Sequence, residues 1–141
     1  MKDKTFTALS GIFFLLFIIG VGAVTLNEPI STMLRAKNVA PSPLKSFGVV
    51  FPQIASTGRS NVKVSVYIRG VDGSILANRS VKLSAEPAVV TIAPSDSAIT
   101  NEIGQAEFTL TSDSTGKIKL KAQETTSNTD IINIPSVEFV Q

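Results

Sequence analysis

The sequence predicts an all-β domain, an antiparallel sandwich of seven to eight strands, preceded by one N-terminal transmembrane helix. Three observations lead to this fold class. A strongly apolar stretch without charged residues lies near the start of the chain. From Lys45 onward, apolar residues recur at every second position, which is the period of a half-buried strand. Gly, Asp, Asn, Ser and Pro separate these short segments at intervals of about ten residues.

The apolar stretch covers residues 8–26 and lies inside a charge-free window, residues 5–27. A helix of this length covers roughly 28 Å, close to the thickness of the hydrocarbon core of a bilayer. We therefore predict a membrane anchor over residues 8–26, after a short cytoplasmic tail, residues 1–7. The most apolar part of the anchor is Ile12, Phe13, Phe14, Leu15, Leu16, Phe17, Ile18 and Ile19.

The same stretch also meets the requirements of a secretory signal peptide. Lys2 and Lys4 give it a basic start, and the small residues 21–23 offer a cleavage site. The apolar run nevertheless continues to Leu26 and exceeds the usual length of a signal core, which favours a retained anchor. The alternative is a protein that is secreted after cleavage.

Charge does not decide the orientation of the anchor, because Lys2 and Lys4 precede it while Arg35 and Lys37 follow it. An inside N-terminus is favoured by the shortness of the tail and by the character of the domain downstream. The expected localisation is therefore the cell membrane, with a single pass and an extracytoplasmic C-terminal domain.

Residues 27–45 are predicted to form a stalk and a linker. Residues 27–37 have the features of a short helix, with Asn27 as its cap and Ile30, Met33 and Leu34 as an apolar stripe. A linker without regular structure is the alternative. The two prolines in residues 38–44 indicate an extended, semi-rigid spacer.

The strands of the domain, residues 46–141, follow from alternation. Phe47, Val49 and Phe51 alternate before Pro52, which cannot donate to a ladder, so this strand should lie at an edge or bend there. The apolar sets that predict the other strands are Val62, Val64, Val66 and Ile68; Val81, Leu83 and Ala85; Val89, Val90 and Ile92; Ala106, Phe108 and Leu110; Ile118, Leu120 and Ala122; Ile131, Ile132 and Ile134; and Val137 and Phe139.

Composition limits the function classes. About 115 residues follow the anchor, enough for one domain with its own core. The chain has no cysteine and no histidine, so it lacks disulfides, thiol nucleophiles and the commonest metal ligand and acid–base residue. Lys117, Lys119 and Lys121 alternate along one strand instead of forming a basic patch. We expect no enzyme, no cofactor, no metal, no small-molecule substrate and no nucleic-acid partner.

The acidic side chains in the predicted turns could in principle bind calcium. Asp72, Asp96, Asp113 and Asp130 all lie in such turns. Their spacing does not resemble a calcium-binding loop, and aspartate is an ordinary turn residue. We therefore expect no metal ligands among them.

One segment carries a family resemblance. Residues 100–108, with the sequence TNEIGQAEF, resemble the T-(D/N)-x-x-G-x-A segment of the bacterial immunoglobulin-like domains, group 1, the repeats of the invasin and intimin adhesins. Matching pieces occur in order at residues 62–66, 72–73, 78–83, 115–122 and 137–139. The chain departs from the family at residues 73–76, where it has GSIL in place of G-N-P-V. The likeness covers about residues 46–141 and implies an immunoglobulin-like sandwich in an extracytoplasmic setting.

Four residues of this segment have expected roles that need no ligand. Gly104 supplies a turn conformation that a residue with a Cβ disfavours, and Thr100 and Asn101 can cap local backbone groups. Ala106 leaves room where the two sheets approach each other. The resemblance therefore implies architecture, while binding in such adhesins usually depends on other domains or on loops.

Two functions are consistent with this organisation. The first is a non-enzymatic, membrane-anchored surface protein that presents one immunoglobulin-like domain as a spacer, adhesion or protein-interaction module. Its partners would be the bilayer, through residues 8–26, and other surface or envelope proteins, including a second copy at an unpaired edge strand. The alternative is a pilin-like or envelope-complex subunit whose helix packs in an assembly. The type IV pilin pattern is not met. It requires a glutamate five residues after the glycine that ends the leader, and five residues after Gly11 the chain has Leu16.

Overall fold

The computed structural model describes residues 3–35 and 39–141 as two separate compact units, a helix and a β-domain. The fold class predicted from the sequence is confirmed, because an apolar N-terminal helix precedes a β-sandwich. Part of the predicted stalk and spacer, residues 36–38, lies outside the described residues.

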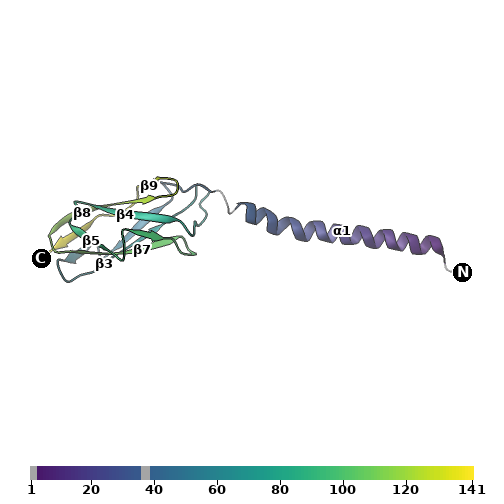
Figure 1. Ribbon diagram of the computed structural model, residues 1–141, viewed down its shortest axis with the longest axis horizontal. Helices are drawn as coiled ribbons and strands as arrows, with labels where there is room; N and C mark the ends of the chain where they lie inside the picture. Colours follow the sequence, from purple (N-terminus) through teal and green to yellow (C-terminus); the bar gives the residue numbers. More distant parts are fainter. Residues whose placement is uncertain (1–2, 36–38) are drawn as a thin grey trace. The chain divides into compact units, whose positions relative to one another are not determined.

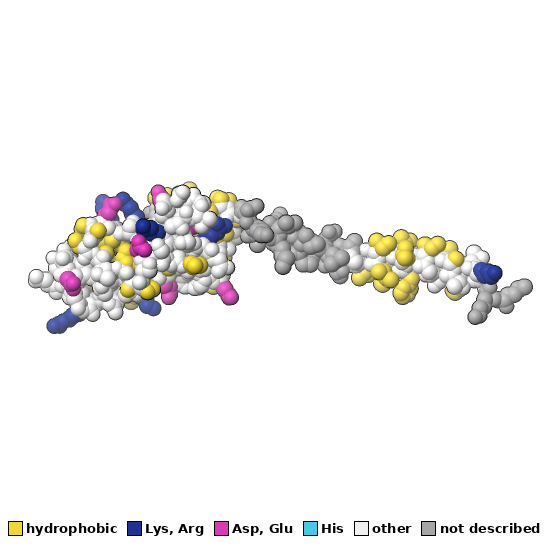
Figure 2. Space-filling model, in the orientation of Figure 1, with side chains coloured by type: hydrophobic (Ala, Val, Ile, Leu, Met, Phe, Trp, Pro, Cys, Tyr) yellow, Lys and Arg dark blue, Asp and Glu magenta, His cyan; other side chains and the backbone are white. Residues whose placement is uncertain are grey.

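Helix α1 spans Lys4–Arg35 and is about 48 Å long. Its segment Lys4–Gly22 is long and apolar enough to cross a membrane. The large apolar side chains from Phe6 to Ile19 are each more than half exposed, and Figure 2 shows hydrophobic side chains along this part of the helix. A helix that is apolar on all sides requires an apolar environment, so α1 fits a membrane anchor.

The helix also includes residues 27–35, which the sequence indicated as a separate stalk helix capped by Asn27. Continuing an existing helix adds one hydrogen bond per residue, whereas starting a new one requires a costly nucleus. The backbone therefore remains helical through this segment, and no new helix begins at Asn27.

The β-domain consists of two sheets that face each other, with the core between them (Figure 1). The four-stranded sheet has the order β1 (Phe47–Phe51), β3 (Val62–Tyr67), β7 (Gln105–Ser112), β5 (Val90–Ala93). The six-stranded sheet has the order β2 (Ile54–Ser56), β10 (Val137–Val140), β8 (Gly116–Glu124), β4 (Ser80–Glu86), β6 (Ser97–Ile99), with β9 (Thr129–Ile131) also paired to β8.

The strand pairs are antiparallel except for β2 with β10, which is parallel. The described residues form ten strands, against the seven to eight predicted. The two strands that the sequence did not indicate are β2 and β6. Each is three residues long, too short for an alternation to be recognised.

The core is built from the inward side of each alternating strand. Val62, Val64 and Val66 of β3 are fully buried, and the predicted inward residues of β7, β8 and β10 are buried with them. Ala85, Val90, Ile92 and Ile134 are partly buried and pack against this core. Ile132, in contrast, is exposed, because it follows the end of β9 and points away from the sandwich interior.

Strand β1 has the alternation that the sequence shows, but its large side chains face outward. Gly48 and Val50 are on the core side, and a Cβ at Gly48 would lie 3.1 Å from two side-chain carbons of Ile134. As Pro52 predicted, β1 is an edge strand of its sheet. Its outer edge is partly covered, because the Gly48 N–H donates to the Asn133 carbonyl at 2.8 Å.

The segment before β1 is attached to the domain from residue 40 onward. The Ser42 N–H donates to the Arg69 carbonyl at 2.7 Å, and the Val71 N–H donates to the Ala40 carbonyl at 3.0 Å. Ser46 is buried and accepts a hydrogen bond from the Arg69 N–H at 3.0 Å. Most of the predicted spacer is therefore part of the folded domain.

Burial predicts how two substitutions will differ in stability. We expect Leu110→Ala to lower the free energy of unfolding by about 2–5 kcal/mol, because Leu110 is fully buried on β7. Ile132→Ala removes a similar side chain from an exposed position and should change it by less than about 0.5 kcal/mol. Urea denaturation of the full chain in detergent micelles, followed by circular dichroism, measures both. Equal losses would contradict this arrangement of the core.

Candidate functional site

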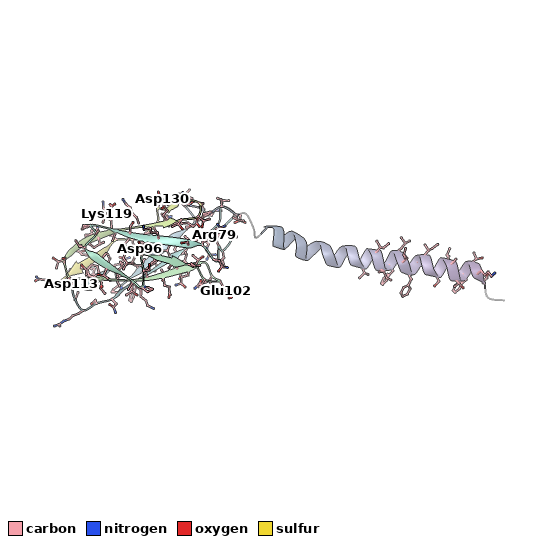
Figure 3. All side chains as sticks on the ribbon, in the orientation of Figure 1. Arg79, Asp96, Glu102, Asp113, Lys119 and Asp130 are labelled. Atoms are coloured by element: carbon pink, nitrogen blue, oxygen red, sulfur yellow. The ribbon has the colours of Figure 1, made fainter. Side chains whose placement is uncertain are left out.

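The acidic side chains that the sequence places in turns do not come together in the described part of the chain. Among the side chains that the structure describes, those of residues 3–22 and 39–141, no group of three acidic residues is arranged to hold a metal ion. Figure 3 shows Asp96, Asp113 and Asp130 well separated on the domain. Asp72 instead accepts hydrogen bonds from the Ser74 hydroxyl, at 2.6 Å, and the Ser74 N–H, at 2.9 Å, and these bonds lower its pKa.

Thr100 connects two loops at the end of the domain where the chain enters. Its side chain is buried, and its hydroxyl donates to the Leu76 carbonyl at 2.8 Å and accepts from the Arg79 N–H at 2.9 Å. Its backbone pairs with the same loop, since its N–H donates to the Arg79 carbonyl at 2.8 Å and its carbonyl accepts from the Asn78 N–H at 2.9 Å. These four bonds hold residues 76–79 against the segment before β7.

Asn101 closes the next turn. Its side-chain oxygen accepts from the backbone N–H groups of Ile103, at 3.1 Å, and Gln105, at 3.0 Å. The Gly104 N–H donates to the Asn101 carbonyl at 2.9 Å. The turn is an Asx-type arrangement that leads directly into β7.

Gly104 lies in the left-handed region, with φ of +73°, at a point of close approach. Its carbonyl accepts from the Ile68 N–H at 2.8 Å, and a Cβ on Gly104 would lie 3.0 Å from the Ile68 carbonyl oxygen. Ala106 follows two residues later, is buried, and pairs with Val66 on β3. The structure thus brings all four residues of the predicted motif to one end of the four-stranded sheet, in structural positions.

A row of apolar side chains lies on the outer face of the four-stranded sheet. Phe47, Val49 and Phe51, which we call the apolar ridge, are 38%, 47% and 76% exposed. The Phe47 ring stacks on Tyr67 of β3, with 5.0 Å between the ring centroids. The ridge is preorganised at one end by this aromatic pair.

A hollow of about 310 Å³ lies beside the ridge on the same face. It is present because β5 ends at Ala93, before Pro94, and leaves β7 uncovered at its edge. Its outward-facing lining is Lys63, Ser65, Ala93, Pro94, Glu107 and Thr109. The Gln105 amide on the same face donates to Ser65 Oγ at 3.1 Å and to the Glu107 carboxylate at 3.0 Å.

On the outer face of the six-stranded sheet, two lysines form ion pairs. Lys121 forms an ion pair with Glu86 at 2.7 Å, which lowers the pKa of Glu86. Lys82 Nζ lies 3.6 Å from Asp96 Oδ2. Lys117 of β8 is opposite Glu138 of β10 in the strand register. A hollow of about 320 Å³ lies on this face as well, lined by Lys82, Ser84, Lys121, Ala122, Gln123 and Asp130, so a hollow alone does not distinguish the two faces. The apolar ridge makes the opposite face the candidate interaction surface.

A buried carboxylate organises the turn after β8. Glu124 is fully buried and accepts from the Ser127 N–H at 2.8 Å, the Thr126 N–H at 3.3 Å and the Ser127 hydroxyl. Burial raises its pKa, but the hydrogen bonds from Ser127 and Thr126 outweigh burial and hold the pKa below its ordinary value. Sequence reasoning missed this residue, because its burial depends on the path of the turn.

Two packed sheets joined by short loops, with the first two strands, β1 and β2, at the edges of different sheets, define an immunoglobulin-like β-sandwich. Residues 46–140 match the family model of the bacterial Ig-like domain (group 1). The chain belongs to this family, as the TNEIGQAEF segment had indicated. The sequence has no match among curated proteins.

Solved structures of intimin and of a Yersinia adhesin have the same fold. The D00-D0 domain of intimin is 23% identical, with a TM-score of 0.59 over 74% of this chain and 48% of the intimin fragment. Yersinia pseudotuberculosis adhesin InvE is 17% identical, with a TM-score of 0.58 over 74% of this chain and 34% of that protein. An intimin fragment in complex with the intimin-binding domain of its translocated receptor is 21% identical, with a TM-score of 0.59 over 71% and 33%. The chain therefore spans half or less of these structures.

The close approach at Gly104 predicts a difference between two glycine positions. Gly73 also has a positive φ, +86°, but open space at its Cβ position. Gly73→Ala should therefore lose about 1–2 kcal/mol of stability from the backbone alone. Gly104→Ala has the same backbone cost and also brings a methyl group against the Ile68 carbonyl, so it should lose about 1 kcal/mol more. Denaturant unfolding compares the two, and equal losses would show that the backbone yields at Gly104.

The pKa of Glu124 predicts a change in the acid stability of the domain. Because the folded-state pKa lies below the ordinary value of 4.5, the carboxylate stabilises the fold fully above that pH and progressively less as the pH falls below it. Glu124→Gln should lower stability at neutral pH and remove this part of the acid dependence. Ser127→Ala keeps the carboxylate but removes one donor, so it should weaken the dependence without abolishing it. Thermal unfolding between pH 3 and 7 tests both, and an unchanged slope in Glu124→Gln contradicts the assignment.

Proposed function

We propose that the protein is a non-enzymatic, membrane-anchored surface protein that presents one immunoglobulin-like domain outside the cell as an adhesion or protein-interaction module. The observation that carries this proposal is the combination of an apolar helical segment, Lys4–Gly22, whose large side chains are exposed, with a sandwich that has its own core. The helix requires an apolar environment, whereas the domain buries its apolar side chains in a core of its own.

The anchor role rests on residues 12–19 and their neighbours. These side chains are large, apolar and exposed around the whole helix, which favours hydrocarbon over water. Support for the outside position comes from a structural neighbour, because the InvE structure, which has the same fold, is that of an adhesin. Support for a protein partner comes from the intimin fragment, which was solved together with a receptor domain.

The interaction role rests on the outer face of the four-stranded sheet. The apolar ridge exposes three large side chains in a row, next to a hollow with Lys63 and Glu107 at its rim. An apolar strip beside a polar rim is typical of protein interaction surfaces. A role as a spacer alone would not require this face.

A second candidate function is a subunit of an envelope assembly, in which the helix packs against copies of itself. The length of α1 favours this alternative, because about 48 Å exceeds the roughly 30 Å of a bilayer core. The additional turns would then pack against neighbouring helices.

Fractionation of cells that produce the native protein tests both functions. We expect a chain that begins at Met1, stays with the membrane after carbonate washing, and loses its domain to protease added outside the cell. An N-terminus near Val24 with a soluble protein contradicts the anchor, and a protected domain contradicts the orientation. Material that sediments as polymer after shearing supports the assembly subunit instead. A cytoplasmic marker protein controls for cell lysis.

A further inference from the structure

We propose that the outer face of the four-stranded sheet binds the same face of a second copy of this chain. Phe51 of each copy fills the hollow of the other, and Lys63 of each faces Glu107 of the other. This inference extends the proposed interaction module by naming its partner. It does not require that the protein be anchored, since it concerns only the β-domain.

The strand register places the parts of this face in rows that cross the sheet. Phe51 is paired with Lys63, Lys63 with Thr109, and Thr109 with Ala93, so one row connects the end of the ridge to the hollow. The next row contains Val49, Ser65 and Glu107. The ridge therefore lies at one edge of the face, and the hollow extends to the opposite edge.

A two-fold axis that runs along the strands, between β3 and β7, makes this face complementary to itself. The rotation reverses the order of the strands across the sheet, so β1 of one copy lies over β5 of the other. It does not change the position of a residue along the strand direction, so each row lies over the same row of the second copy. Phe51 then faces Ala93 and the hollow beside it. Because this contact occurs twice, both ridges are covered.

The same rotation brings opposite charges together. It places β3 over β7 of the second copy, with Lys63 one row away from Glu107, about 7 Å along the strand and within reach of a lysine side chain. Among the described side chains of residues 3–22 and 39–141, neither Lys63 nor Glu107 has an ion-pair partner. The Gln105 amide donates to the Glu107 carboxylate and holds it toward the face.

Pairing through the edge of β1 is a poorer route to the same dimer. The Asn133 carbonyl already occupies the Gly48 N–H, and Pro52 has no N–H to donate. The face, in contrast, is open. The proposed contact is limited to one face of a four-stranded sheet, so we expect a weak dimer. Two copies held in one membrane would associate more strongly, because confinement raises their effective concentration.

Charge reversal tests the proposal on the full chain in detergent micelles, by sedimentation equilibrium. Lys63→Glu alone and Glu107→Lys alone each place like charges opposite each other twice, so each should weaken dimerisation about tenfold or more. An equimolar mixture of the two variants should restore it, because every facing pair across the mixed dimer is again opposite in sign. Lys119→Glu is the control for Lys63→Glu. It makes the same change in net charge, but on the six-stranded sheet, so it should leave dimerisation unchanged.

Each result decides the question, and unfolding curves of every variant confirm that the domain is folded. A wild-type chain that stays monomeric up to about 1 mM, or variants that associate like the wild type, overturns the proposal. If the chains associate through α1 alone, the charge-reversal variants will associate like the wild type, which overturns the proposal. Failure of the mixture to restore the dimer also overturns it. Membrane retention of the same variants is measured in parallel, so a soluble protein with charge-dependent pairing would contradict only the anchor.

Discussion

Burial of the inward sides of two sheets holds this domain together, and the other features are positioned by it. The chain has no cysteine, so no disulfide links the two sheets. Phe108 and Phe139 are the largest of the fully buried side chains, and they come from opposite sheets. Each buried Val, Leu, Ile or Phe contributes roughly 1.5–3 kcal/mol, which is offset by the entropy of ordering the chain. Because successive side chains of a strand point to opposite faces, the burial of one set of residues in the core also determines which residues face outward.

The loops at the end of the domain where the chain enters are held by hydrogen bonds between polar groups that do not take part in the apolar core. Thr100 is buried there, and it bonds to the loop before β4 through both its hydroxyl and its backbone. Gly104 allows the next turn to approach Ile68 more closely than a side chain would permit. Next to these loops, beside the start of β4, Glu124 performs a comparable task for the turn after β8. Local hydrogen bonds thus shape the loops, while packing determines the layers.

The sequence predicted most of the sandwich because its strands alternate clearly. Four inward residues in a row identify β3, and the TNEIGQAEF segment identifies the family, because a turn that needs Thr, Asn and Gly at fixed spacing leaves a local signature. Strands β2 and β6 were missed, since three residues carry no period. The hollow could not be predicted either, because it depends on where β5 ends relative to β3 and β7.

Strand β1 shows why the candidate surface was not recognised from the sequence. Its inward positions hold Gly48 and Val50, so the larger Phe47, Val49 and Phe51 dominate the pattern although they face outward. Gly48 stays small because Ile134 packs over it, and the same Asn133–Ile134 segment covers the edge of the strand. A covered edge prevents continuous sheet pairing between chains. The apolar side chains of β1 are therefore left to make contacts through the face, where shape and charge, and not the backbone, select the partner.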